Sequence, residues 1–141
     1  MQRGVTLPEL LLALVLLGLL SLIAIPRLAA ITNAAALRSE ATLLLRALDV
    51  ARISAIRLGT PTTLTLTESR YAVAGGVPGD SAAPWQREGP AARGVALSGG
   101  GVPIRFSPAG IALGVANRTF TLSRGGASRR VVISRLGRIT P

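Results

Sequence analysis

The sequence has no cysteine and no histidine, and all sixteen of its basic residues are arginine. Without cysteine there is no disulfide and no thiol chemistry. Without histidine the chain lacks the commonest general base and the commonest transition-metal ligand. A serine nucleophile would find neither a histidine nor a lysine to activate it. These absences argue against an enzyme, so we expect no catalytic residue, no metal site and no cofactor.

Acidic residues are also scarce, with six in the whole chain and a formal net charge of +10. Five of the six are scattered, with no pair closer than eight residues and no Asp-x-Asp spacing of a calcium loop. The sixth, Glu9, stands directly before the uncharged and almost wholly apolar run Leu10–Pro26. Glu9 is therefore the acid whose position asks for an explanation.

The apolar run beside Glu9 is too short to cross a membrane alone. Leu10 to Ile25 makes roughly 24 Å of helix against a hydrocarbon core of ~30 Å, whereas a start at Val5 gives roughly 31 Å. Glu9 then lies in or at the edge of the bilayer, where a charge costs roughly 2.5 to 3.5 kcal/mol at the centre and requires a partner. Composition leaves two alternatives open, a secretory signal peptide cleaved near Ala34–Ala36 and a plain signal anchor.

The residues around Glu9 carry a family resemblance. Gly4-Val5-Thr6-Leu7-Pro8-Glu9-Leu10-Leu11 resembles the class III leader junction of type IV pilins and type II secretion pseudopilins, with Val5 and Pro8 in place of the usual Phe and aliphatic residue. The resemblance implies that a prepilin peptidase cuts after Gly4 and methylates the new amine of Val5. It also implies that Glu9 pairs with the amine of a neighbouring subunit during assembly. Residues 1–4 are then the leader peptide, and residues 5–26 are the transmembrane and assembly helix.

The residues after Pro26 predict that the helix continues as an amphipathic segment over 27–59. Apolar residues recur at spacings of three and four, at Ala41, Leu44, Leu45, Leu48, Ala51, Ala55 and Ile56. Gly59, with Pro61 beyond it, predicts the helix end. Pro26 removes one helical hydrogen bond and predicts a kink. We therefore expect one long helix from Val5 to Leu58.

Residues 60–141 change to a strand and turn composition. The segments expected to form strands are Thr62–Thr67, Tyr71–Ala74, Val95–Leu97, Val102–Phe106, Thr119–Leu122 and Arg129–Ser134. The stretch Gly75–Pro90 is rich in Gly, Pro and Ala and is expected to be a loop around Trp85. One long helix followed by short antiparallel strands predicts an α+β, type IV pilin-like fold, with the helix packed on a small antiparallel β-sheet domain.

Four further segments restrict the resemblance to one group within the pilin and pseudopilin family. Ala51-Arg52-x-x-Ala55-Ile56, Ile104–Gly110, Thr119–Leu122 and Arg130–Ile139 resemble, in order and spacing, the GspH/FimT-type minor pseudopilins of type II secretion and type IV pilus systems. The resemblance implies a low-copy subunit that primes or caps a filament at the bacterial inner membrane and supports protein secretion. Its partners would be other minor and major pilins or pseudopilins. The chain would cross the membrane once, with its C-terminal domain outside the cytoplasm.

A second function is left open by the C-terminal charge. From residue 105 to the end there are seven arginines and no acid. The guanidinium group of arginine can donate two parallel hydrogen bonds to a phosphate. The arginines that are candidates for binding duplex DNA are therefore Arg129, Arg130, Arg135 and Arg138. FimT-type pilins include DNA receptors for natural transformation whose motif resembles Gly-Arg-x-Arg; Gly137-Arg138-Ile139 matches it, but Thr140 stands at the second arginine. The alternative is an arginine-rich surface that is merely solvated.

Overall fold

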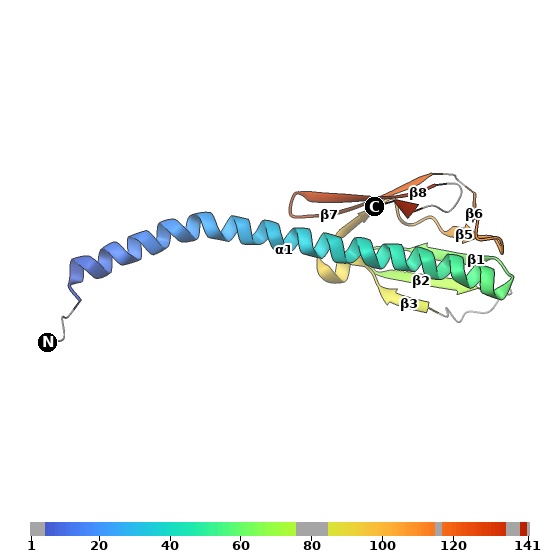
Figure 1. The fold of residues 1–141 in the computed structure, drawn as a ribbon, viewed down its shortest axis with the longest axis horizontal. Helices are drawn as coiled ribbons and strands as arrows, with labels where there is room; N and C mark the ends of the chain where they lie inside the picture. The colour runs from blue at the N-terminus through green and yellow to red at the C-terminus, as the bar shows by residue number, and fades with distance from the viewer. Residues whose placement is uncertain (1–4, 76–84, 115–116, 135–138, 141) are drawn as a thin grey trace.

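One long helix is the frame of the molecule. The computed structural model describes residues 5–75, 85–114, 117–134 and 139–140, and its helix α1 spans Leu7–Leu58 (Figure 1). Pro8 lies in the first turn, where its missing N–H would have no helical acceptor. Gly59 ends the helix in the left-handed conformation, with φ of 62°. The predicted helix and its stop at Gly59 are confirmed, except that the helix begins at Leu7 and not at Val5.

Pro26 bends the helix without breaking it. α1 continues through Pro26, and Figure 1 shows a gentle arc in this half of the helix in place of a localised kink. The residues from 22 to 32 are all exposed, so no packed neighbour holds the helix axis on either side of the proline. The distortion from the ring can therefore spread over several turns.

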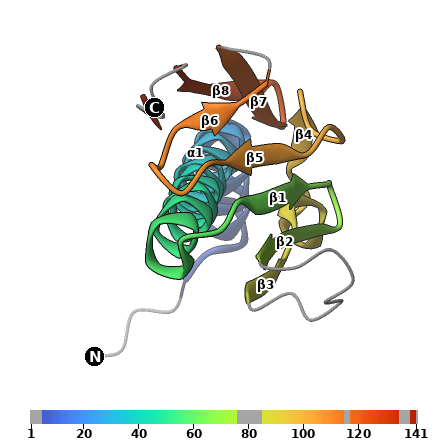
Figure 2. The same cartoon turned by 90° about the vertical axis from the view of Figure 1, so that its right-hand side faces the viewer.

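The strands after α1 form two antiparallel sheets in the described residues. Sheet A has the order β3-β2-β1-β5-β6, and sheet B has the order β4-β7-β8-β9. Sheet A consists of β1 (Thr62–Leu66), β2 (Arg70–Gly75), β3 (Trp85–Glu88), β5 (Ile104–Phe106) and β6 (Ala112–Leu113). Sheet B consists of β4 (Ala96–Ser98), β7 (Arg118–Arg124), β8 (Ala127–Ile133) and β9 (Ile139–Thr140). Figure 2 shows both sheets curving around the second half of α1, which confirms the predicted α+β fold.

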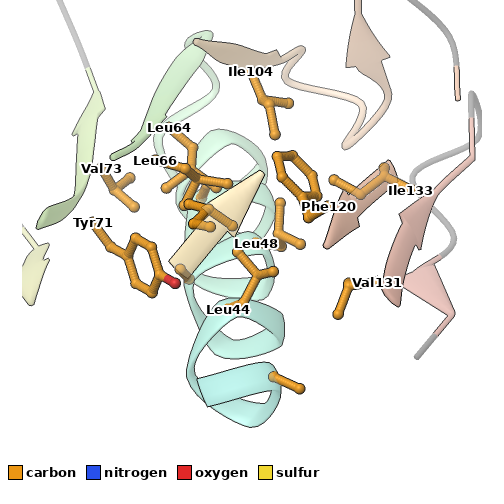
Figure 3. Close-up of a cluster of buried hydrophobic side chains, with 14 of the residues drawn as sticks. Leu44, Leu48, Leu64, Leu66, Tyr71, Val73, Ile104, Phe120, Val131 and Ile133 are labelled. Atoms are coloured by element: carbon orange, nitrogen blue, oxygen red, sulfur yellow. The ribbon is translucent and has the colours of Figure 1, made fainter. Parts of the chain in front are cut away.

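The core lies between α1 and the inner faces of both sheets. Figure 3 shows Leu44 and Leu48 of the helix among side chains from both sheets, including Leu64, Tyr71, Val73, Phe120, Val131 and Ile133. The predicted helix stripe is partly corrected, because Leu45 is only half-buried and Ile56 is 50% exposed. At about 100° per residue, the buried helix residues are centred on the direction of Leu44, and the side chains of Leu45 and Ile56 point roughly 100° or more away from it.

The expected loop over Gly75–Pro90 is corrected where the structure describes it. Residues 85–88 form β3, which pairs with β2, and Pro90–Arg93 forms the short 3-10 helix η1. The sequence of β3, Trp-Gln-Arg-Glu, predicts a loop because it has only one apolar residue and lacks the alternation typical of a strand. A strand at a sheet edge needs little apolar character, and its charges discourage further pairing. The two-residue strands β6 and β9 were also not expected.

The glycines between β4 and β5 carry the chain from sheet B to sheet A. Gly99 and Gly101 both have φ of 87°, a conformation that side chains other than glycine rarely adopt. Around them the backbones of the two sheets approach closely. A Cβ on Gly99 would lie 2.4 Å from the Thr119 carbonyl oxygen, whereas a Cβ on Gly101 would meet nothing within 4 Å.

Replacing each of these two glycines with alanine distinguishes the effect of backbone strain on stability from the effect of a steric clash. Gly99→Ala should lower the free energy of unfolding by about 1 to 3 kcal/mol more than Gly101→Ala, because only the first adds a clash with backbone that cannot rotate away. Both variants share the same unfavourable φ, so Gly101→Ala is the matched control. Chemical unfolding of the full chain in detergent, followed by the fluorescence of its single tryptophan, measures the difference. Equal losses would contradict this description of the crossover.

Candidate functional site

Glu9 lies in the first turn of α1 with its side chain exposed. A carboxylate near a helix N-terminus is favoured by the exposed N–H groups and the helix dipole. Within the described residues, however, no cationic side chain forms an ion pair with Glu9. Val5 is also exposed, and Gly4 lies outside the described residues. The structure therefore presents the predicted assembly carboxylate on an open surface, ready for a partner from outside the chain.

The surface around Glu9 is apolar over several helical turns. α1 contains an 18-residue window with a mean hydropathy of 2.5, none of which is buried in the chain. From Leu10 to Ile31 the large aliphatic side chains are between 52% and 77% exposed. An exposed apolar surface of this extent marks a contact with lipid or with other proteins. The first half of α1 is thus long and apolar enough to cross a membrane.

The described arginines of the C-terminal candidate cluster do not share a face. Consecutive residues of β8 alternate between its two sides, so Arg129 faces the helix with Val131, whereas Arg130 faces outward and is exposed. The Nε atom of Arg129 is buried. Arg135 and Arg138 lie outside the described residues. Duplex DNA binding by these four arginines stays a prediction.

Other C-terminal arginines are used within the fold. Arg118 donates from Nη1 to the Val102 carbonyl at 2.6 Å, and Arg124 donates from Nη1 to the Arg93 carbonyl at 2.8 Å. Both side chains therefore tie β7 to neighbouring segments. Three of the chain's four aromatic residues, Tyr71, Phe106 and Phe120, are completely buried. Only Trp85 is left with surface on which a base or another side chain could stack.

An ion pair between a buried acid and a partly exposed arginine was not foreseen from the sequence. Glu40, on α1, is completely buried, and its Oε1 accepts a hydrogen bond from Nη1 of Arg93 at the end of η1. Its other oxygen, Oε2, has no partner in the described residues, and neither has the nearby hydroxyl of Tyr71. Burial raises the pKa of the Tyr71 phenol, and the charge of Glu40 raises it further while Arg93 opposes the rise. Tyr71 is therefore a neutral donor-acceptor group in this core.

The position of Glu40 could have been noticed. It lies three residues after Leu37 and four before Leu44, which puts it on the same helix face as two buried leucines. An acid at such a position requires a cation within hydrogen-bonding reach, but nothing in the sequence identifies Arg93, 53 residues away. The pair joins η1 to α1 and fixes the direction in which Arg93 reaches the surface. Among the described residues, no group of three acidic, histidine or cysteine side chains is placed to hold a metal ion.

The fold is similar to that of solved minor pilins. Two crystal structures of the type IV minor pilin FimU of Pseudomonas aeruginosa strain PAO1 match with TM-scores of 0.62 and 0.60, both at 20% identity. They cover 74% of this chain and 86% and 90% of FimU, respectively. At this identity the likeness concerns the fold. No curated protein matches the chain.

Two family models match the sequence itself. The prokaryotic N-terminal methylation motif covers residues 1–25, the segment that contains Gly4, Val5 and Glu9. The model described as type II transport protein GspH covers residues 40–137, which is more than two thirds of the chain. Together with the long apolar helix and the pilin-like domain, these matches confirm the resemblance drawn from the sequence. The chain belongs to the GspH family and is a GspH/FimT-type minor pseudopilin.

Proposed function

We propose that the chain is a minor subunit that primes or caps a filament of a type II secretion or type IV pilus system at the bacterial inner membrane, and that it supports protein secretion. The observation that carries this proposal is Glu9, an exposed carboxylate at the head of an apolar helix with no ion-pair partner in the described residues. The family's match to type II transport proteins supports the secretion role. The C-terminal domain lies outside the cytoplasm in this proposal.

The sequence limits what can neutralise Glu9. From Val5 to Pro26 the chain has no basic residue, and Arg27 is eighteen residues further along the helix. At 1.5 Å per residue that separation is roughly 27 Å, far beyond the reach of an ion pair. The amine created by cleavage before Val5 is therefore the cation closest to the same membrane depth. In an assembled filament, the amine of an adjacent subunit can be brought beside Glu9.

Processing at Gly4 is the first requirement of this role. A prepilin peptidase would cut between Gly4 and Val5 and methylate the new amine. The mass of the purified chain should correspond to Val5–Pro141 plus one methyl group, and a bulkier residue as in Gly4→Leu should leave the precursor intact in the membrane. An N-terminus near Ala36, or an unprocessed wild-type chain in its native host, would contradict the leader assignment.

Glu9 provides the test of assembly. Glu9→Ala should leave cleavage and folding unchanged, because the domain begins tens of residues away, but should abolish incorporation into filaments. The measurement is the fraction of the chain recovered in sheared filaments relative to the membrane. Glu68→Ala, which removes an exposed acid of the domain, is the control and should incorporate normally.

The outcome separates two explanations of how α1 supports assembly. Loss of incorporation in Glu9→Ala but not in Glu68→Ala would mean that the carboxylate itself is required. Incorporation of Glu9→Ala at the wild-type level would show that hydrophobic contacts of α1 suffice, and the proposed assembly role of Glu9 would be wrong.

A further inference from the structure

A groove of about 800 Å³ lies between the second half of α1 and the edge strand β3. Its apolar surface comes from Leu43, Val50 and Ile53 of the helix and from Trp85 of the strand. Leu43, Val50 and Trp85 are half-buried against the core, and Ile53 is 53% exposed. The groove is therefore an open depression with an apolar base, on the domain and away from the membrane segment.

The rim of this groove has more positive than negative groups. Arg46, Arg70, Arg87 and Arg93 line it, together with the two acids Asp49 and Glu88. Arg93 is already held by the buried Glu40. The other three arginines form no ion pair with any described side chain. A ligand that brings carboxylates would therefore meet unneutralised guanidinium groups, which form strong, charge-assisted hydrogen bonds with carboxylates.

The strand beside the groove also offers backbone groups. β3 is the last strand of sheet A and pairs only with β2 among the described strands (Figure 2). Its residues 85 and 87 lie opposite the buried Val73 and Tyr71, so Trp85 and Arg87 lie on the helix side of the sheet. An edge strand of this kind can pair with an extended peptide, whose backbone provides affinity while side chains provide specificity.

We propose that this groove binds an extended acidic peptide segment of a neighbouring filament subunit, in which carboxylates alternate with apolar side chains. The carboxylates bind Arg46 and Arg87, and the apolar side chains pack on Trp85 and the helix. The proposal rests on the filament role proposed above and names the kind of partner that the domain recognises.

Two other occupants fit the groove less well. Nucleic-acid phosphates could bind the arginines, but a phosphate backbone would make no use of the aliphatic base formed by Leu43, Val50 and Ile53. A second copy of this chain lacks a suitable segment, because its acids are isolated from one another, Glu9 belongs to the membrane helix and Glu40 is buried. Charge and surface chemistry together favour a different, acidic chain.

The single tryptophan of the protein reports directly on the groove. The mature full chain in detergent micelles is titrated with a synthetic peptide in which Glu alternates with Leu, and Trp85 emission is recorded. Parallel titrations use a peptide in which Lys replaces Glu, and a single-stranded oligonucleotide. We expect a saturable change in Trp85 emission with the Glu peptide only.

Charge reversal at matched positions distinguishes the groove from the overall charge. The double variant Arg46→Glu/Arg87→Glu should weaken binding of the Glu peptide at least tenfold, because both groove contacts become repulsive. Arg38→Glu/Arg105→Glu makes the same change in net charge, also at one exposed helix residue and one exposed strand residue, but outside the groove. This control should stay within about twofold of the wild type, since exposed charges at a distance are screened by salt.

Three results would overturn the proposal: no saturable change with the Glu peptide, equal weakening in both double variants, or an oligonucleotide that changes Trp85 emission as strongly as the peptide. Circular dichroism of the variants establishes that each is folded. Failure of the groove is distinguishable from failure of the filament role, because peptide binding does not require Glu9. A wild-type chain that is absent from sheared filaments would refute the filament role while leaving peptide binding intact.

Discussion

A carboxylate at the head of an apolar helix is the constraint on which the rest of the molecule depends. Glu9 is exposed, and the large aliphatic residues that follow it are exposed as well. Neither the charge nor the apolar surface is satisfied within the described chain. Lipid can cover the aliphatic side chains, but it cannot neutralise a carboxylate. In the proposed filament role, the helix lies beside another chain that brings a cation to the level of Glu9.

The same helix serves the domain in a different way in its second half. Small residues at Ala41, Ala47, Ala51 and Ala55 are almost completely buried and allow two sheets to approach the helix closely. The approach is close enough for the Thr62 hydroxyl to donate to the Ala51 carbonyl at 2.7 Å inside the core. The domain is therefore built directly on the helix, which continues without a break from the exposed apolar half into the core. The Glu40–Arg93 pair adds a polar connection at the end nearer the membrane.

The sequence predicts the parts of this fold that depend on local pattern. The helix from the membrane segment to Gly59 is long and periodic, and the strands β1, β7 and β8 alternate clearly, so their existence is evident without a structure. The family resemblance then rests on the order of short motifs. β3 escapes prediction because its only reason to be a strand is the neighbouring β2. The same is true of Arg93, whose partner lies on a distant element.

Candidate sites made of adjacent residues are likewise predictable from the sequence, whereas sites made of distant residues are not. Gly4, Val5 and Glu9 are adjacent in sequence, and their significance follows from the junction itself. The C-terminal arginines were grouped by proximity in sequence, but the alternation of β8 places Arg129 and Arg130 on opposite faces. The groove between α1 and β3 is lined by residues as far apart in sequence as Leu43 and Arg93. One of its sides is β3, a strand that the sequence predicts to be a loop. Binding surfaces made by long-range packing leave little trace in a single sequence.

A structure of the assembled filament, or of this chain bound to its neighbouring subunit in the membrane, tests the central claim most directly. The distance to measure joins the amine nitrogen of Val5 in one subunit to the nearest carboxylate oxygen of Glu9 in the next. We predict a charge-assisted hydrogen bond of about 2.7 to 2.9 Å between them. A Glu9 carboxylate that faces lipid, or that is neutralised by a group other than a neighbouring N-terminal amine, would contradict the account.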